Sequence, residues 1–323
     1  MDWALQIGSV LLGVVALFYG AEWLVRGSSS IALKMGISPL VIGLTIVALG
    51  TSCPELIVCI GLNLSGNPDT AVGNIVGSNI CNIALVLGVS ALVRPIVIKA
   101  QLLKRDTPLL IGFTLLFIWM LSDGELEMRE GVVLLSLIVL YLLVIFRLAK
   151  AETDPDILEE FEEEIGTAAE ARRRSSALMV LMIVMGVAVL VVGAEFLKTG
   201  ALAIATRIGV SDAVIGLTLV AVGTSLPELA TSFVAAARNE GDLLIGNVIG
   251  SSIFNICAIM GITILVKNPM VITEILPGGL AVMFGSAVLV LPLMWTRRRL
   301  SRTEGLILLV GYLVYTGYLF TRA

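Results

Sequence analysis

Apolar runs of about 20 residues, separated by short polar connections, make up most of the chain. A helix of that length crosses the hydrocarbon core of a bilayer, so each run predicts a transmembrane helix. The first and sixth runs are expected to continue to about residues 34 and 206 as long tilted helices. We place ten spans at 4–26, 39–64, 70–93, 107–122, 131–149, 178–200, 212–237, 242–266, 277–295 and 304–321. The pattern predicts an all-α polytopic membrane protein.

The composition supports this interpretation and narrows the chemistry. Hydrophobic residues make up 58% of the chain and charged residues 14%, whereas soluble domains carry about 25% charged residues. There is no histidine, and all four cysteines fall within apolar spans without a CxxC pair. Zinc, haem and histidine proton relays are therefore poor interpretations. We expect no cofactor, no nucleic acid partner and no required protein partner, with the lipid bilayer as the surroundings.

The two halves of the chain are related by a constant offset of 173 residues. The match runs without a gap from Gly20 to Gly88, which corresponds to Gly261, and 13 of 16 positions in 41–56 are identical to those in 214–229. The charged loop 150–176 separates the halves. It is interpreted as an acidic cytoplasmic linker, with a weak divalent-cation-binding or regulatory surface as the alternative. The expected units are residues 1–149, the loop 150–176 and residues 177–323.

Five helices in each half would make the second copy enter the membrane from the opposite side. With the N-terminus outside, sixteen Lys and Arg residues fall on the inner side and five on the outer side, in agreement with the positive-inside rule. We therefore expect two inverted five-helix repeats in the cell membrane, with both termini outside. Inverted repeats with interrupted helices are typical of secondary transporters, whose binding sites lie at the midplane.

Two copies of one motif interrupt apolar spans, as "GTSCPEL" at 50–56 and "GTSLPEL" at 223–229. Proline removes a backbone donor, so helices 2 and 7 are expected to be broken there. The carbonyls near Ala48 and Thr51 should then lose their helical partners and act as hard oxygen ligands. Glu55 and Glu228 are costly at membrane depth unless a cation bridges them. Pairing with Lys or Arg is the alternative, although neither motif has a basic residue within one turn.

A second motif places polar residues along one helical face, as "GNIVGSNICN" at 73–82 and "GNVIGSSIFN" at 246–255. Residues four apart lie on the same face of a helix, so these side chains form a stripe of oxygen atoms. Ligand contact and plain hydrogen bonding between helices are both open for this stripe. Asn74 and Asn247 are expected to be structural. Glu22 and Glu195 are expected to form ion pairs with Arg26 and Lys198 on their own helices.

The paired motifs resemble the two α-repeats of the cation/calcium antiporter superfamily, most closely its prokaryotic sodium/calcium exchangers. The resemblance implies a secondary antiporter, not an enzyme, that transports calcium and sodium while its first and sixth helices slide across a fixed core. It implies a calcium site made by Glu55, Glu228 and the carbonyls of Thr51 and Thr224. It also implies sodium sites that share Ala48, Ser52, Ser78, Ala221, Ser225 and Ser251, with Asn82 and Asn255 at the middle position.

Two departures from related branches bear on the coupling ion. Asn255 stands where the potassium-dependent branch and some prokaryotic relatives carry an acidic residue, and a neutral amide there argues against potassium co-transport. The proton-coupled branch resembles "GNxxE" where this chain has "GTSxPE" twice. Sodium-for-calcium exchange is therefore expected to be electrogenic and independent of potassium. A proton- or potassium-coupled exchanger of calcium or another divalent cation is the alternative, followed by a passive cation channel. An intramembrane aspartyl protease is disfavoured because no paired aspartates lie within the spans.

Overall fold

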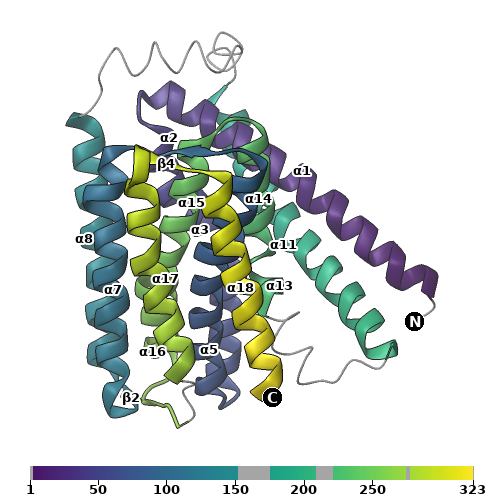
Figure 1. Ribbon diagram of the computed structural model, residues 1–323, viewed down its shortest axis with the longest axis vertical. Coiled ribbons are helices and arrows are strands. Elements are labelled where there is room, and N and C mark those ends of the chain that lie inside the picture. The colour runs from purple at the N-terminus through teal and green to yellow at the C-terminus, as the bar shows by residue number, and fades with distance from the viewer. Residues whose placement is uncertain (1–2, 152–174, 209–220, 274–276, 323) are drawn as a thin grey trace.

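Two long helices pack against each other along one flank of a helical bundle (Figure 1). They are α1 (Trp3–Met35) and α11 (Ser176–Arg207), and both continue past their apolar runs as predicted. The computed structural model describes residues 3–151, 175–208, 221–273 and 277–322. Most of the loop 150–176 and the first part of the expected span 212–237 lie outside these described residues.

The other elements follow the apolar runs. In the first half they are α2 (Pro39–Ile42), η1 (Gly43–Val47), α3 (Ala48–Thr51), α4 (Cys53–Leu64), α5 (Pro68–Ile80), η2 (Cys81–Val86), α6 (Leu87–Val93), β1 (Ile96–Val97), η3 (Leu102–Asp106), α7 (Thr107–Met120), η4 (Leu121–Asp123), β2 (Glu125–Leu126) and α8 (Met128–Ala151). In the second half, after α11, they are α13 (Ala221–Thr224), α14 (Leu226–Ala237), α15 (Gly241–Phe254), η6 (Asn255–Ile259), α16 (Met260–Val266), β3 (Met270–Val271), α17 (Pro277–Trp295), η7 (Thr296–Arg298), β4 (Arg299–Leu300) and α18 (Arg302–Arg322).

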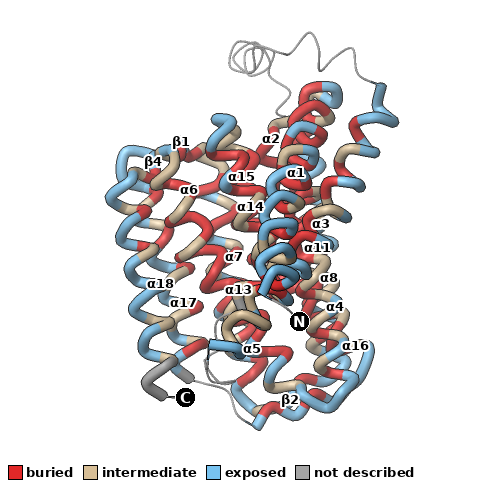
Figure 2. The backbone as a smooth tube through the Cα atoms, turned by 90° about the vertical axis from the view of Figure 1, so that its right-hand side faces the viewer, coloured by how far each residue is buried: buried red, intermediate tan, exposed pale blue. Residues whose placement is uncertain are grey.

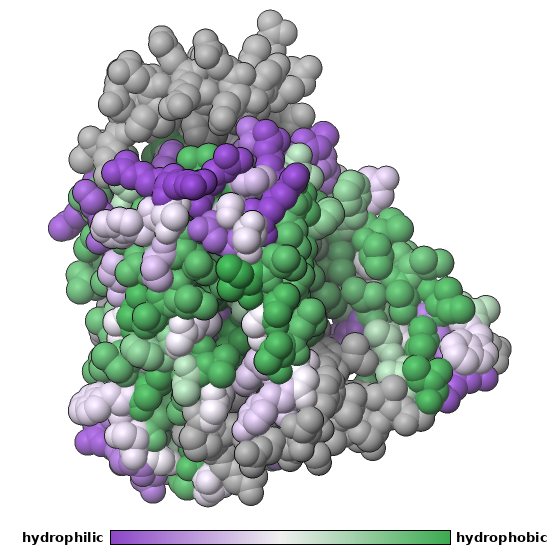
Figure 3. Space-filling view, in the orientation of Figure 1, coloured by the Kyte–Doolittle hydropathy of each residue, from purple (hydrophilic) through white to green (hydrophobic). Residues whose placement is uncertain are grey.

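The apolar surface agrees with a chain that crosses a membrane several times. Within the described residues, seven helices are long and apolar enough to span a bilayer, and the bent pair 39–51 and 53–64 would be an eighth. Figure 3 shows a hydrophobic band between hydrophilic groups at the two ends of the bundle. The protein is thus a mostly helical, multi-pass membrane protein. The count of ten spans stays a prediction.

The two central spans are buried, and the flanking spans face outward. In the most apolar 18-residue stretches of spans 68–93 and 241–266, 78% and 89% of the residues are buried. The corresponding share for span 128–149 is 28%. Figure 2 shows buried residues concentrated on the inner helices, α15 among them. A helix that is buried on all sides cannot face lipid, so its polar side chains must find partners inside the protein. The two polar stripes of the sequence lie on these central spans.

The "GTSCPEL" and "GTSLPEL" motifs break their helices, as predicted. The chain bends by 44° between Thr51 and Cys53, and α13 likewise ends one residue before Ser225. Pro54 and Pro227 lie in the first turns of α4 and α14, where proline is tolerated because an amide donor there has no helical partner. Each motif therefore ends one helix and begins another.

Two short strand pairs extend the internal offset beyond the motifs. Val97 pairs with Arg299 and Met270 pairs with Leu126, both in antiparallel fashion. Adding 173 converts 97 into 270 and 126 into 299, so one pair is the counterpart of the other. The correspondence between the halves thus continues through the connections that follow the second motif.

Glycines spaced by seven residues bring α1 and α11 into backbone contact. Their contacts run antiparallel, because Gly13 faces Gly193 whereas Gly20 faces Gly186. A methyl group on Gly13 would lie 2.5 Å from the Leu197 amide nitrogen. Small residues at such spacing allow membrane helices to approach closely. This glycine seam was not predicted, although the seven-residue spacing of Gly13, Gly20 and Gly27 and of Gly186, Gly193 and Gly200 could have indicated it.

We expect Gly13→Ala to destabilise the folded protein by about 1–3 kcal/mol, because the added methyl group overlaps the α11 backbone. Gly8→Ala is the matched control on the same helix, since nothing lies within 4 Å of a methyl group there. Thermal unfolding of both variants in detergent tests this. Equal melting temperatures for the two variants would show that the seam does not hold the helices together.

Candidate cation-binding site

Two fully buried glutamates lie in the first turns of the helices that follow the breaks. Glu55 belongs to α4 and Glu228 to α14, and both are 0% exposed. The N-terminal end of a helix carries partial positive charge from its free amide groups, which favours a carboxylate there. Each break thus supplies an environment in which a buried glutamate can be held.

Each glutamate is bonded by a serine from the other half of the chain. The Ser52 hydroxyl donates to Glu228 Oε1 at 3.1 Å, and the Ser225 hydroxyl donates to Glu55 Oε1 at 3.3 Å. Ser78 adds a longer bond to Glu55 Oε1 at 3.5 Å. Because Ser52 and Ser225 belong to the two broken-helix motifs, these bonds bring both motifs into one site.

The second oxygen of each carboxylate is left bare. Glu55 Oε2 and Glu228 Oε2 are buried and have no hydrogen-bond partner among the described residues. No ion pair within the described parts of the chain includes either glutamate. Pairing with Lys or Arg, the alternative left open by the sequence, is therefore not found there. A buried carboxylate without a counter-charge is strongly destabilised unless it is protonated or binds a cation.

The threonines of the motifs contact the polar stripe of the opposite half. Thr51 Oγ1 donates to Asn247 Oδ1 at 3.1 Å and lies 3.3 Å from Ser251 Oγ. Thr224 Oγ1 makes the corresponding contacts with Asn74 Oδ1 at 3.4 Å and with Ser78 Oγ at 3.5 Å. The structure therefore gathers the hydroxyls of both motifs and both stripes around the two glutamates.

Asn74 and Asn247 link these threonines to their own helical hairpins. The Asn74 amide donates to Cys59 Sγ at 3.4 Å, and the Asn247 amide donates to Ser232 Oγ at 3.2 Å. Cys59 and Ser232 are 173 residues apart. The two amides have the bonding expected of structural residues, as the sequence analysis anticipated. Cys59 and Ser232 were missed because each is a small residue within an apolar run.

Asn82 and Asn255 lie at π-helical turns that the sequence analysis did not predict. Asn82 is the second residue of η2 and Asn255 is the first residue of η6. π-Helical turns inside α-helices are frequent at functional sites because they redirect side chains and backbone groups. Both asparagines are 0% exposed. The sequence pattern cannot reveal such a turn, since one extra residue per turn leaves the apolar composition unchanged.

The expectation for the Ala48 carbonyl was wrong in detail. It keeps a backbone partner, because the Ser52 amide donates to it at 3.1 Å. The donor that Pro54 lacks would have reached the carbonyl four residues earlier, at Gly50. The second motif differs, since the Ser225 amide donates to Val222 instead. The corresponding Ala221 is the first described residue of α13.

Glu22 and Glu195 form the predicted ion pairs with Arg26 and Lys198, at 2.6 and 2.5 Å. Glu22 also pairs with Arg238, at the end of α14. This second pairing was not predicted, because α1 and α14 are far apart in the sequence. Glu22 thus joins α1 to the helix that carries Glu228, whereas Glu195 is partnered on its own helix.

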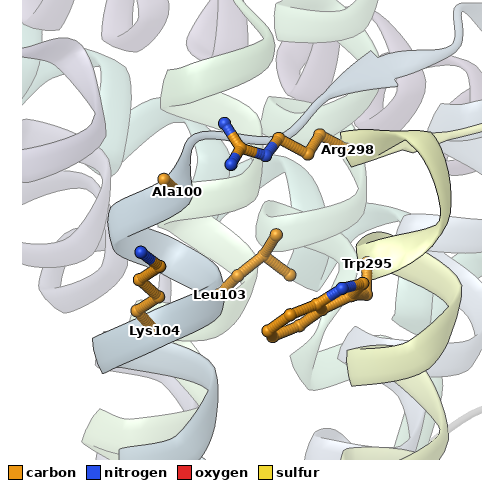
Figure 4. A pocket seen from close by; sticks show the side chains of 5 residues that line it. All are labelled: Ala100, Leu103, Lys104, Trp295 and Arg298. Atoms are coloured by element: carbon orange, nitrogen blue, oxygen red, sulfur yellow. The ribbon is translucent and has the colours of Figure 1, made fainter.

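A separate surface pocket is lined by Ala100, Leu103, Lys104, Trp295 and Arg298 (Figure 4). Figure 4 shows the two basic side chains near Ala100 and the Trp295 ring beside Leu103. Two positive charges repel a cation. This pocket shares no residue with the glutamate site and is not part of it.

Comparisons with known proteins agree with this arrangement. A family model described as sodium/calcium exchanger protein matches residues 5–147 and 178–321. Over 317 residues, 97% of this chain, it is 42% identical to the putative antiporter CaxA of Alkalimonas amylolytica, of which it covers 98%. It is 33% identical to the sodium/calcium exchanger MaX1 of Methanosarcina acetivorans, with 96% and 97% of the two chains covered.

The fold also matches a solved structure of the sodium–calcium exchanger NCX_Mj. The two chains are 34% identical and superpose with a TM-score of 0.83 over 98% of this chain and 100% of that one. The chain belongs to the sodium/calcium exchanger protein family, within the cation/calcium antiporter superfamily. It is accordingly a membrane transporter that carries out cation/calcium antiport.

Proposed function

We propose that the protein exchanges sodium for calcium across the cell membrane by alternating access, electrogenically and without potassium. The observation that carries this proposal is the pair of buried carboxylates, without ion-pair partners among the described residues and surrounded by hydroxyl groups from both halves. Such a site is suited to hard cations, which bind oxygen ligands.

Calcium is the substrate that neutralises the two glutamates. One divalent cation balances the charge of two carboxylates, and the bare Oε2 atoms of Glu55 and Glu228 are available to bind it. We assign the Thr51 and Thr224 carbonyls to the same calcium site. The resemblance to exchangers and the buried charge support this assignment together.

Sodium would use the remaining oxygen atoms around the glutamates. The proposed sodium ligands come from both motifs and both stripes, namely Ala48, Ser52, Ser78, Ala221, Ser225 and Ser251, with Asn82 and Asn255 at the middle position. Sodium and calcium would share the two carboxylates, so one substrate excludes the other. Shared ligands thereby produce exchange rather than co-transport.

We further propose ten spans in two inverted repeats, residues 1–149 and 177–323, joined by a cytoplasmic loop. The antiparallel contacts of α1 with α11 and the matching strand pairs support the inversion.

Exchange coupled to protons or potassium is the main alternative, and a passive cation channel is the weaker one. Calcium uptake into proteoliposomes, driven in turn by outward sodium, potassium and proton gradients, separates these functions. We expect uptake with sodium alone that responds to an imposed membrane potential. Uptake that needs potassium or a pH gradient would favour the alternatives, and flux without any counter-ion gradient would indicate a channel.

We predict that Glu55→Gln and Glu228→Gln each abolish calcium exchange, because one carboxylate cannot neutralise a divalent ion in a low-dielectric site. Glu195→Gln is the control, since its side chain is 63% exposed and pairs with Lys198 outside the site. Transport assays on equal amounts of folded protein make the comparison. Near-normal exchange by either site variant would contradict the assignment of Glu55 and Glu228 to the calcium site.

Single cysteines in a background without the four native ones test the proposed orientation. We expect a cysteine near Glu160, which lies outside the described residues, to resist a membrane-impermeant thiol reagent in intact cells. A cysteine at position 322 should react, because the C-terminus is assigned to the outside. The reverse labelling pattern would contradict the orientation and leave the repeat itself intact.

The charge at position 255 should set the voltage response. The resemblance to sodium/calcium exchangers implies three sodium ions per calcium ion. With both glutamates ionised, one calcium ion then leaves the site neutral and three sodium ions leave it at +1. The membrane potential acts on that charge by about 2.3 kcal/mol per 100 mV. We predict that Asn255→Asp weakens the voltage response or creates a dependence on potassium or pH. Asn255→Gln, which adds no charge and keeps an amide oxygen, should do neither. Identical voltage responses in the unmodified protein and Asn255→Asp would contradict this account.

A further inference from the structure

Asn79 joins the two central spans beside the candidate site. It belongs to α5 and is 1% exposed. Its amide nitrogen donates to the main-chain carbonyl of Ser252 at 3.3 Å. Its oxygen accepts a hydrogen bond from Asn255 Nδ2 at 3.0 Å. Asn79 therefore contacts both a fixed backbone group and a residue of the candidate site.

The chemistry of these bonds determines the direction of both amides. A main-chain carbonyl can only accept, so the nitrogen of Asn79 must face Ser252. The Asn79 oxygen then faces the Asn255 amide. Because this oxygen only accepts hydrogen bonds, the Asn255 atom that bonds to it must be the nitrogen. The oxygen of Asn255 is consequently turned away from Asn79. The Ser252 carbonyl of α15 thus determines, through Asn79, how the Asn255 amide is oriented.

The Asn255 oxygen that results is available to a ligand. Asn255 is 0% exposed, and its Oδ1 has no partner among the described residues. It lies one helical turn beyond Ser251, which contacts the site threonine Thr51. A buried carbonyl oxygen without a donor is destabilised unless a cation or water satisfies it.

The other half of the chain lacks this arrangement. The counterpart of Asn79 is Ser252, whose hydroxyl donates to Val248 on its own helix at 2.9 Å. The counterpart of Asn255 is Asn82, and both of its amide atoms are without partners in the described parts of the chain. The two asparagines at the middle position therefore differ, because one amide is held and the other is not.

We propose that Asn79 is a positioning residue that presents the Asn255 oxygen, and not its amide nitrogen, to a sodium ion at the middle position. This inference rests on the proposed function. A rotated Asn255 amide would place N–H groups against the cation, which repel it. Asn82 can present either atom, so it accommodates sodium in one state of the site and water in another. The middle position is thus asymmetric although the repeat around it is symmetric.

Two substitutions at position 79 test the proposal. Asn79→Leu keeps a side chain of similar size but removes both hydrogen bonds. Asn79→Ser introduces the residue found at the equivalent position of the other half, and its side chain is too short to reach both partners. We expect each to raise the sodium concentration for half-maximal exchange about fivefold, the effect of one lost hydrogen bond. The half-maximal calcium concentration should change less than twofold. Ser252→Ala, the matched control in the other half, should leave the sodium dependence unchanged.

A double-mutant comparison separates positioning from a merely structural role. In an Asn255→Ala background, Asn79→Ser should cause no further change in the sodium dependence, because the amide that it orients is absent. The role of Asn79 would be overturned if the fold-change in the double variant equalled the product of the fold-changes in the two single variants. It would also be overturned if both Asn79 variants left the sodium dependence unchanged. Sodium-driven exchange by the unmodified protein is measured first, and its absence would count against the proposed function instead.

Discussion

The burial of two carboxylates that have no basic partner among the described residues is the constraint on which the site depends. Glu55 and Glu228 are fully buried, and each has one bonded oxygen and one bare oxygen among the described residues. Hydrogen bonds from Ser52 and Ser225 reduce the cost of this burial but leave the charge in place. The two carboxylates therefore need either protons or a cation to offset their charge, and a single divalent ion would balance both.

The surrounding fold supports that constraint from both halves of the chain. The helix breaks place each glutamate in a first turn, and the serine next to each break bonds to the opposite glutamate. The buried central spans supply the amides and hydroxyls, while α1 and α11 cover the flank through glycine contacts. The pair α1 and α11 thus covers the flank, and Glu22 of α1 also contacts Arg238 at the end of the helix that carries Glu228.

The sequence predicted the multi-pass helical fold, the helix breaks and the pairing of Glu22 and Glu195 because these depend on local composition and spacing. The resemblance to the antiporter superfamily implied that Ser52, Ser78, Ser225 and Ser251 share one site, and the structure brings their hydroxyls together near the two glutamates. Other features depend on tertiary contacts that no local pattern records. The π-helical turns at Asn82 and Asn255, the bond of Asn79 and the second pairing of Glu22 with Arg238 belong to this group.

Equilibrium binding of radiolabelled calcium to the purified protein tests the central claim most directly. The unmodified protein should bind one calcium ion per chain, and sodium should displace it. The variant with both Glu55→Gln and Glu228→Gln should bind none while keeping its melting temperature, since the buried charge is then gone. Saturable binding that survives the loss of both carboxylates, or binding that sodium does not displace, would contradict a shared site at the two glutamates.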